Sequence, residues 1–244
     1  MTGDESTPAI LVEDLDVDRG GRRVLDGVSF TVPSGSVTGL LGPSGSGKTT
    51  LMRAIVGAQS HCRGRVIVLD QPAGAPPLRR QVGYVTQAPS VYGDLSVEDN
   101  TRYFAALYGV ALLAIDDVID DIGLADQRRQ RADHLSGGER ARLSLGCALV
   151  ASPDVLILDE PTVGLDPVLR ADLWTRFHDL ADDGTTLVVS SHVMDEAARC
   201  DRLLLLRDGR LVADRTPDQL RGDTGTDDLE AAFLHLILSG QGEA

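Results

Sequence analysis

Residues 42–49 constrain the fold of this chain more than any other stretch. They read GPSGSGKT, which fits the pattern G-x-x-x-x-G-K-[ST]. The short apolar stretch SVTGLL, at 36–41, precedes the pattern, and KTTLMRAIVGA, at 48–58, follows with its apolar residues at helical spacing. A glycine loop between a strand and a helix is the setting in which this pattern binds phosphate groups. We therefore predict a strand, a phosphate-binding loop and a helix here.

Lys48 within this loop is the only lysine of the chain, whereas the other 22 strongly basic side chains are arginines. Lysine carries a compact ammonium that can lie along such a loop and contact the β- and γ-phosphate oxygens of a nucleotide, while the wide guanidinium of arginine would not fit. Glycines let backbone N–H groups turn inward, and the helix N-terminus adds partial positive charge. The alternative, a glycine-rich turn with a stray lysine, disagrees with the downstream partners described below.

Strand and helix patterns alternate along both ends of the chain, which predicts an α/β fold with a mainly parallel sheet and helices on both faces. RGGRR, at 19–23, is typical of a hairpin turn. The expected strands are 10–15, 24–32, 36–41, 65–69, 82–86, 155–159 and 185–191, followed by RLLLLRDGRLVAD with a DG turn. The expected helices of this part are 48–58, 168–182 and a short one at 193–199.

Between these parts, residues 88–152 have a helical pattern and predict an inserted subdomain. SVEDNTRYFAALYG begins with Ser96 three residues before Asp99, a capping-box arrangement, and ends at Gly109. We expect a second helix from Leu112 to Ile122 and a third after LSGGE, which begins at residue 135.

VLILDEP, at 155–161, ends a predicted buried strand with two acids, Asp159 and Glu160. The carboxyl end of such a strand lies beside the phosphate loop. Asp159 is expected to hold Mg²⁺ through water while Thr49 ligates the ion directly. Glu160 is expected to orient and deprotonate an attacking water. The alternative is a strand that ends in a solvated acidic turn.

LSGGE, at 135–139, precedes a predicted helix and offers a second anion site. Ser136, Gly137 and Gly138 would supply a hydroxyl and backbone N–H groups at the helix N-terminus. A simple capped helix start is the alternative. Two phosphate-binding devices in one small chain suggest that two chains sandwich each nucleotide.

Composition narrows the function further. The net charge of -14 argues against general affinity for nucleic acid or anionic lipid. The three cysteines, Cys62, Cys147 and Cys200, are widely spaced and fit a reducing cytoplasm rather than a disulfide framework or a zinc site. We expect no signal peptide, and the uncharged stretch 27–47 is interrupted by Pro and Gly, so it is no membrane span. A membrane function would require another chain to cross the bilayer.

GPSGSGKT, LSGGE, LILDEP, GLDP and SSH occur in this order, and the chain thereby resembles the ATPase subunit of an ABC transporter over residues 9–220. The resemblance implies a P-loop NTPase with a RecA-like core, a parallel sheet, an N-terminal antiparallel β subdomain and an inserted α-helical subdomain. Its implied parts are an ATPase core at 9–87 and 153–221, a helical signature subdomain at 88–152 and a helical tail at 222–244.

The resemblance also implies roles for single residues. Gln87 resembles the family's glutamine that senses Mg²⁺ and γ-phosphate and contacts the membrane subunit. His192 resembles the histidine that stabilises the γ-phosphate. Asp166 resembles the aspartate that signals across a dimer. With Lys48 and Glu160, His192 forms the expected catalytic set. The expected metal ligands are Thr49, Gln87 and Asp159. The expected ATP-binding residues are Arg19, Gly42, Pro43, Ser44, Gly45, Ser46, Gly47, Lys48, Thr49, Thr50, Gln87, Ser136, Gly137, Gly138 and Asp166.

The chain departs from the family pattern at two positions. An aromatic residue that stacks on adenine usually lies about where this chain has Arg19, and no aromatic occurs between residues 10 and 29. Arg19 either stacks its guanidinium on adenine or is a solvated turn residue. The fifth signature residue is Glu139 rather than the commoner Gln, and activity is expected to survive this change.

Three functions share these motifs. VYGDLSVEDNTRYFAALYGV and LEAAFLHLILSG resemble the drug-resistance, ABC-2 type exporter branch, which implies a motor for efflux of drugs or other hydrophobic compounds. Its implied partners are integral-membrane permease subunits and a second ATPase subunit, with no nucleic acid, at the cytoplasmic face of a prokaryotic cell membrane. The alternatives are an importer ATPase and a non-transport ABC ATPase. The last usually has a long coiled coil or two cassettes, whereas this chain has one cassette.

The segment after Gln87, APSVYGDLSVEDN, leads into the helical block and carries Val91, Tyr92 and Leu95. In a soluble enzyme these side chains would be buried in the subdomain core. In a transporter some of them would line an open groove that receives a short helix of the membrane chain.

Overall fold

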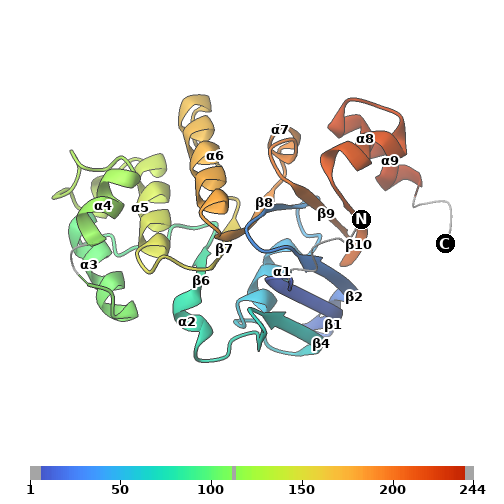
Figure 1. Ribbon diagram of the computed structural model, residues 1–244, viewed down its shortest axis with the longest axis horizontal. Helices are drawn as coiled ribbons and strands as arrows, with labels where there is room; N and C mark the ends of the chain where they lie inside the picture. Colours follow the sequence, from blue (N-terminus) through green and yellow to red (C-terminus); the bar gives the residue numbers. More distant parts are fainter. Residues whose placement is uncertain (1–6, 112–113, 240–244) are drawn as a thin grey trace.

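A computed structural model describes residues 7–111 and 114–239 of the chain. Its strands form two sheets, one of four strands and one of six. The six-stranded sheet is central, the four-stranded sheet covers one of its faces, and a helical block extends from one side (Figure 1).

The four-stranded sheet is antiparallel, with the order β2-β1-β4-β5. Its strands are β1 (Ile10–Arg19), β2 (Arg22–Val32), β4 (Cys62–Val68) and β5 (Gln71–Pro72). Apolar side chains alternate along β1 and β2 and are buried on the inner face, as a half-exposed sheet requires. The predicted N-terminal antiparallel subdomain is confirmed, although β4 begins three residues earlier than Arg65 because its first residues are polar and exposed.

The six-stranded sheet has the order β10-β9-β3-β8-β7-β6 and is parallel except for the β9–β10 hairpin. Its strands are β3 (Val37–Leu41), β6 (Val82–Val85), β7 (Val155–Asp159), β8 (Thr186–Ser191), β9 (Arg202–Arg207) and β10 (Arg210–Arg215). β3, β7 and β8 are buried along their whole length, which explains why they read as continuous apolar runs. The carboxyl ends of these three strands lie at one edge of the sheet.

Helices cover both faces of the central sheet, as predicted. The helices of this part are α1 (Lys48–Ile55), α2 (Leu78–Gln81), α6 (Pro167–Asp182), α7 (Met194–Ala197), α8 (Pro217–Thr224) and α9 (Leu229–Ser239). α1 lies between the two sheets, where Leu51, Met52 and Ile55 join a shared apolar core. α6 packs on the opposite face through Trp174 and Phe177. α2 has no counterpart among the predicted helices because its four residues are too few to show a period.

The helical block follows β6 and precedes β7 along the chain, lies to one side of the central sheet (Figure 1) and has its own apolar core. It contains α3 (Val97–Tyr108), α4 (Ala114–Asp121), the short 3₁₀ helix η1 (Ala132–His134) and α5 (Gly137–Leu149). The predicted helix from Leu112 falls partly outside the described residues, and α4 begins at Ala114.

Ser96 caps α3 and Gly109 ends it in the left-handed region, as predicted. The capping box itself is incomplete. Ser96 Oγ accepts the N–H of Asp99 at 3.0 Å and donates to Asp99 Oδ2 at 2.6 Å. The Asp99 carboxylate therefore binds the hydroxyl and not the backbone N–H of Ser96, because aspartate is one methylene shorter than the glutamate of a full capping box.

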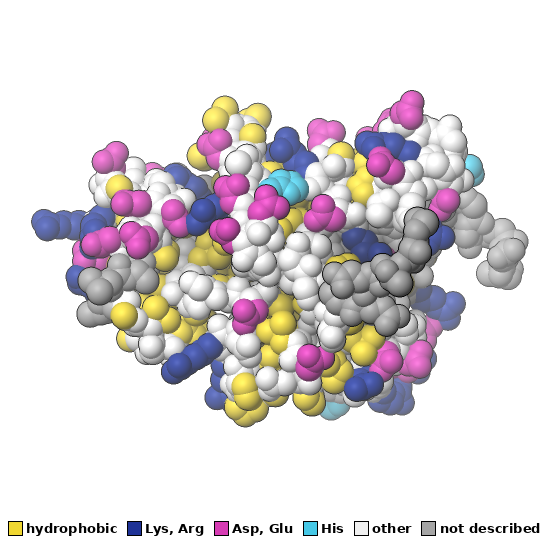
Figure 2. Space-filling model, in the orientation of Figure 1, with side chains coloured by type: hydrophobic (Ala, Val, Ile, Leu, Met, Phe, Trp, Pro, Cys, Tyr) yellow, Lys and Arg dark blue, Asp and Glu magenta, His cyan; other side chains and the backbone are white. Residues whose placement is uncertain are grey.

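None of the helices in the described ranges is long and apolar enough to cross a bilayer. On the face shown in Figure 2, acidic side chains are numerous and arginines are scattered among them. That face therefore presents no continuous basic surface.

Candidate nucleotide site

Two glycines allow the phosphate loop to fold between β3 and α1. Gly42 has φ 153° and Gly47 has φ 110°. A Cβ added at Gly42 would lie 2.1 Å from the backbone oxygen of Leu206, and one at Gly47 would lie 2.8 Å from Cδ2 of Leu25. Because carbonyl oxygens of the backbone cannot move aside easily, Gly42 in particular has no substitute. Both glycines of the pattern are thus required by the close approach of β9 and β2.

The Lys48 side chain lies back along the loop. Its Nζ donates to the carbonyl oxygen of Gly42 at 2.7 Å and to that of Pro43 at 3.2 Å. Burial lowers the pKa of Lys48, while the nearby carboxylates of Glu160 and Asp159 oppose this shift. An ammonium has three N–H bonds, so the two loop carbonyls orient the group without exhausting its donors.

The start of α1 offers donors to an anion. Gly47 is the N-cap, with no side chain that caps the helix, and the first turn has no acidic residue. The first N–H groups of the helix and its dipole therefore point toward the loop without competition. Ser46 Oγ is buried and has no hydrogen-bond partner among the described residues, so it adds one further unpaired polar group to the loop.

The structure brings Thr49 and Asp159 together, as predicted from the ends of β3 and β7. Thr49 Oγ1 donates to Asp159 Oδ2 at 2.8 Å. Ser190 Oγ, at the end of β8, donates to the other carboxylate oxygen, Oδ1, at 2.8 Å. Asp159 is therefore held from both sides although it is only 3% exposed. A hydroxyl and a carboxylate beside a phosphate loop are the oxygen ligands that Mg²⁺ takes in nucleotide sites.

Glu160 lies directly beyond Asp159 in a left-handed conformation, with φ 52°. Its N–H donates to Ser190 Oγ at 2.9 Å, which fixes the turn. Gln87 Nε2 donates to Glu160 Oε2 at 3.0 Å, and Nδ1 of His192 lies 3.5 Å from Oε1. The glutamate thus lies between the two side chains that the sequence placed with it. A non-glycine residue in this region is strained, and such strain is common at functional sites.

Two clefts adjoin Glu160. One, of about 140 Å³, lies between Glu160, His192 and the loop after β7. The other, of about 460 Å³, extends from Gln87 and Glu160 to Gly137 and Arg140 at the start of α5. The carboxylate is therefore reachable from two sides.

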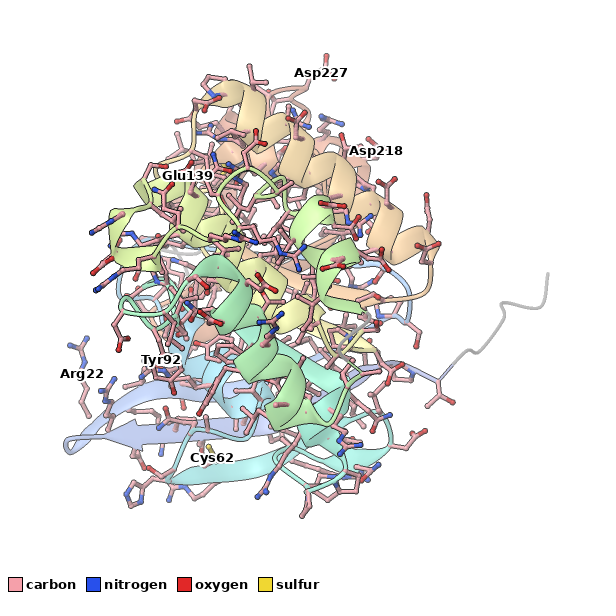
Figure 3. The ribbon with its side chains drawn as sticks, turned by 90° about the vertical axis from the view of Figure 1, so that its left-hand side faces the viewer. Arg22, Cys62, Tyr92, Glu139, Asp218 and Asp227 are labelled. Carbon is pink, nitrogen blue, oxygen red and sulfur yellow. The ribbon has the colours of Figure 1, made fainter. Side chains whose placement is uncertain are left out.

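Within the described residues, the hydrogen bonds of the signature residues join them to one another and not to the phosphate loop. Ser136 and Glu139 form a complete capping box at the start of α5, with Ser136 N donating to Glu139 Oε2 at 2.7 Å and Glu139 N donating to Ser136 Oγ at 3.2 Å. The backbone and side-chain hydrogen bonds from Ser136 lower the pKa of Glu139. Figure 3 shows Glu139 at the start of this helix. The capped helix start, raised above as the alternative, is present here, and Gly137 and Gly138 leave their N–H groups in the first turn.

Two further predicted residues form no hydrogen bond with the phosphate loop in the described part of the chain. Asp166 is the N-cap of α6, and its Oδ1 accepts the N–H groups of Val168 and Leu169 at 2.9 and 3.0 Å. Arg19 ends β1 at the hairpin to Arg22 and is exposed. Figure 3 shows Arg22 projecting away from the sheet beside this hairpin. The side chain of Arg19 has no hydrogen-bond or ion-pair partner within the described ranges.

Ser190 belongs to the site but the sequence did not assign it a role. It pairs with Asp159 in the parallel register of β7 and β8. The signal was its place in SSH, at the end of an apolar strand, but the register that brings it beside Asp159 is visible only in the structure.

The number of protein ligands at the site also fits Mg²⁺ that is bound together with a nucleotide. Among the residues that the structure describes, no group of three His, Cys, Asp or Glu side chains could bind a metal alone. Mg²⁺ in nucleotide sites needs only one or two protein oxygens, because phosphates and water complete its octahedron. Thr49 and Asp159 match that requirement.

The pattern of the family described as "ABC transporter" matches residues 25–163, more than half of the chain. With the two-sheet core, the inserted helical block and the phosphate loop beside Asp159 and Glu160, the chain is an ATP-binding domain of the ABC transporter family, a family of ATPases.

Individual relatives agree. "Probable multidrug ABC transporter ATP-binding protein YbhF" of Escherichia coli (strain K12) is 36% identical over 247 residues, which cover 96% of this chain and 43% of that protein. "Nod factor export ATP-binding protein I" of Rhizobium sp. (strain N33) is 38% identical over 208 residues, 82% of this chain and 68% of the relative. The chain thus spans less than half the length of the first relative and about two thirds of the second.

A solved structure described as "Structure of ATP binding subunit of ABC transporter" superposes with a TM-score of 0.86 at 28% sequence identity. The match covers 94% of this chain and 99% of that one. The predicted fold class is therefore confirmed over the part of the chain that this match covers.

Proposed function

We propose that the chain is the ATP-hydrolysing subunit of an ABC-2 type exporter that acts on drugs or other hydrophobic compounds. The observation that carries the proposal is the position of Glu160, between Gln87 and His192 and one residue beyond the Thr49–Asp159 pair. We thus assign activation of the attacking water to Glu160, contact with the γ-phosphate to His192 and metal binding to Thr49 and Asp159, which are neighbours at one edge of the sheet. The names of the two relatives, one a multidrug and one an export ATP-binding protein, support the direction of transport.

In the proposed reaction the phosphate loop binds ATP. The residues assigned to this loop are Gly42, Pro43, Ser44, Gly45, Ser46, Gly47, Lys48, Thr49 and Thr50. Lys48 moves its ammonium from the loop carbonyls to the β- and γ-phosphates. Thr49 and Asp159, with Gln87, would hold Mg²⁺, which neutralises phosphate charge when bound. Glu160 accepts the proton of the attacking water, and His192 donates to the γ-phosphate.

The subunit is proposed to work as a dimer with ATP between two copies. Ser136 Oγ accepts the N–H of Glu139, so its own proton is free to be donated to a γ-phosphate of the partner's nucleotide. Gly137 and Gly138 add N–H groups at the start of α5. Asp166 caps α6 beside Val163 and Val168, which are 51% and 69% exposed and suit an interface.

Arg19 is proposed to contact the adenine through its guanidinium plane. The support is its exposure at the end of β1 and its lack of another partner within residues 7–111 and 114–239. A solvated Arg19 is the opposite outcome, and binding measurements described below separate the two.

The membrane partner is proposed to dock on the helical block. Tyr92 and Tyr103 are 46% and 45% exposed, and their ring centroids are 4.9 Å apart. Leu107, which lies on α3 with Tyr103, is 62% exposed. Val91 lines the adjacent cleft of about 460 Å³ together with Gln87. Figure 3 shows Tyr92 at the outer edge of the block. A short helix of a permease would fit this apolar groove and sense Gln87 directly.

The proposed parts are a core at 9–87 and 153–221, a moving helical subdomain at 88–152 and a tail at 222–244. The tail boundary lies inside α8, which spans Pro217–Thr224, so the proposed division separates domains by role rather than by secondary structure. The proposed place of work is the cytoplasmic face of a prokaryotic membrane, where ATP is available and the permease is reachable.

One variant tests the hydrolysis and the dimer together. Glu160→Gln keeps the shape of the side chain and its bond with Gln87 but cannot accept a proton from water. We expect ATP to remain bound unhydrolysed and to shift the variant to dimer size on gel filtration. The double variant Glu160→Gln, Lys48→Ala is the control and should stay monomeric. Brisk hydrolysis by Glu160→Gln would contradict its role as base, and a monomer with ATP would contradict the sandwich.

A further inference from the structure

Glu196, in α7, is the most buried carboxylate of the described residues, with 1% exposure. Its Oε2 accepts a hydrogen bond from Ser191 Oγ at 2.7 Å. Its Oε1 lies 3.7 Å from Nε of Arg170 on α6. Neither Oε1 of Glu196 nor Nε of Arg170 has a hydrogen-bond partner within the described ranges. A buried carboxylate is costly unless it is paired, and Arg170 supplies a partner of opposite charge.

Ser191 connects Glu196 to the backbone that carries His192. Ser191 Oγ, which donates to Glu196, also accepts the N–H of Val193 at 3.0 Å. One hydroxyl therefore links the residues on both sides of His192. The His192 side chain is itself 54% exposed, so packing alone does not fix the direction of its ring. The hydrogen bonds through Ser191 instead fix the backbone on either side of His192, and so the point from which its ring extends.

Arg170 lines the cleft between Glu160 and His192 and contacts the loop after β7. Its Nη2 donates to the backbone oxygen of Leu165 at 3.5 Å, the residue before Asp166. Together with Glu160 and His192 it lines the cleft of about 140 Å³ described above. The loop that ends at Asp166 and the turn that carries His192 are thus joined through Arg170 and Glu196.

We infer that Arg170 and Glu196 are positioning residues that hold His192 against Glu160 for ATP hydrolysis. The inference rests on the proposed function, in which His192 contacts the γ-phosphate. Neither residue touches the nucleotide in this scheme. The competing explanation is that the pair only stabilises the packing of α7 on α6.

The kinetic test is a double-mutant cycle on the full chain. Glu196→Ala should lower kcat for ATP at least about tenfold, as misplacement of a catalytic group by a fraction of an ångström does. The KM should change by less than about threefold, because Lys48 and the loop are untouched. In a His192→Ala background the same change should lower kcat by less than about twofold. Equal losses in both backgrounds would overturn the inference and favour the packing explanation.

A matched control and conservative variants test whether a loss of activity reflects only a general loss of fold stability. Asp214→Ala removes another partly buried carboxylate, which pairs with Arg202 on the β9–β10 hairpin at 2.5 Å. It should leave kcat unchanged while its melting temperature falls comparably. If Glu196→Ala does not fold, Arg170→Ala and Glu196→Gln replace it. Glu196→Gln keeps an acceptor for Ser191 and should retain more activity than Arg170→Ala.

A spectroscopic readout separates this inference from the proposed function. The chain has five histidines, so the ring signals of His192 can be assigned in NMR spectra by their loss in His192→Ala. These signals should shift or broaden in Glu196→Ala and stay unchanged in Asp214→Ala. Unchanged His192 signals in Glu196→Ala would overturn the positioning inference. Parent-like hydrolysis by His192→Ala would instead contradict the role proposed for His192, whatever the spectra show.

Discussion

Ser190 donates a hydrogen bond of 2.8 Å to Oδ1 of Asp159, a residue on the neighbouring strand of the sheet. The same hydroxyl accepts the N–H of Glu160 at 2.9 Å. One side chain therefore fixes both acids of the LDE sequence, one by its carboxylate and one by its backbone. This arrangement explains how Glu160 is kept in the left-handed region beside the phosphate loop.

Ser190→Ala should impair hydrolysis more than nucleotide binding. The change leaves one Asp159 oxygen and the Glu160 N–H without a partner, at a cost of about 1–3 kcal/mol in stability for a buried group. We expect a lower melting temperature and a lower kcat, with a modest change in the Kd for ATP. Ser190→Thr is a matched control because it retains the hydroxyl. Parent-like turnover in Ser190→Ala would show that Glu160 is placed without this contact.

Lys48→Ala should weaken nucleotide binding and abolish turnover. Each lost contact with a phosphate oxygen removes a charge-assisted hydrogen bond worth about 1.5–3 kcal/mol. Lys48→Arg keeps the positive charge and serves as the control for shape. It should not restore turnover, because the guanidinium fork does not fit between the carbonyls of Gly42 and Pro43. Near-normal ATPase rates in Lys48→Ala would remove the assignment of the phosphate loop.

Glu139→Gln should change how the melting temperature depends on pH. The pKa of Glu139 is lowered by its hydrogen bonds with Ser136, so its carboxylate stabilises the fold above the unfolded pKa, near 4.5, and this contribution is lost as the pH falls through the lower, folded pKa. A charged acid at a helix N-terminus contributes about 0.3–1 kcal/mol.

The parent should therefore melt above the Glu139→Gln variant at pH 6 and match it near pH 3. Asp172→Asn removes an exposed acid from the middle of α6 and is the control. A constant difference between Glu139→Gln and the parent across this range would contradict the capping explanation. ATPase activity should survive in the variant, since its amide oxygen still accepts the Ser136 N–H.

Arg19→Ala should raise the Kd for ATP by a few-fold to about tenfold if the guanidinium stacks on adenine. Arg19→Tyr should hold or improve affinity, because an aromatic ring stacks on the base as well. Arg22→Ala, at the other end of the same hairpin, is the matched control. Fluorescence titration with an ATP analogue measures all three. An unchanged affinity in Arg19→Ala would mean that Arg19 is only a solvated turn residue.

Tyr92→Glu should spare folding and ATP binding but prevent association with a permease. The side chain is 46% exposed and contacts Tyr103, so a charge at this position alters the groove without entering a core. The measurement is co-purification from membranes beside a melting curve of the isolated subunit. Leu234→Glu places the same charge at another exposed apolar residue, on α9, and should leave association intact.

Co-purification of Tyr92→Glu with the permease would rule out this docking site. If the unmutated chain brings no membrane protein with it, the transport function itself would give way to a non-transport ATPase.

The sequence predicted the middle of the central sheet well because β3, β7 and β8 are buried on both faces and read as apolar runs, such as VLILD at 155–159. It also predicted that Asp159 and Thr49 lie near one another, because the carboxyl end of β7 and the phosphate loop after β3 are at the same edge of the sheet. It did not predict α2, because a helix of four residues is too short to show a helical period in the sequence. Nor did it assign Ser190, Arg170 or Glu196, because their contacts depend on strand register and on how α6 and α7 pack.

The apolar residues after Gln87 illustrate the same limit. Val91 packs against the core of the helical block, whereas Tyr92, one position later, is largely exposed. A list of apolar letters could not separate the two, because the segment is a loop without a period. The fold decides which of them is available to a partner.

Lys48 gives the chain a chemical property that follows from its position. It is the only side-chain amine, and burial lowers its pKa, which raises the fraction of free base that reacts with acylating reagents. Reagents that label most proteins at many surface sites would find one side chain here, inside the phosphate loop. The extent of acylation at Lys48, read by mass spectrometry, would therefore report directly how much of the protein has nucleotide bound.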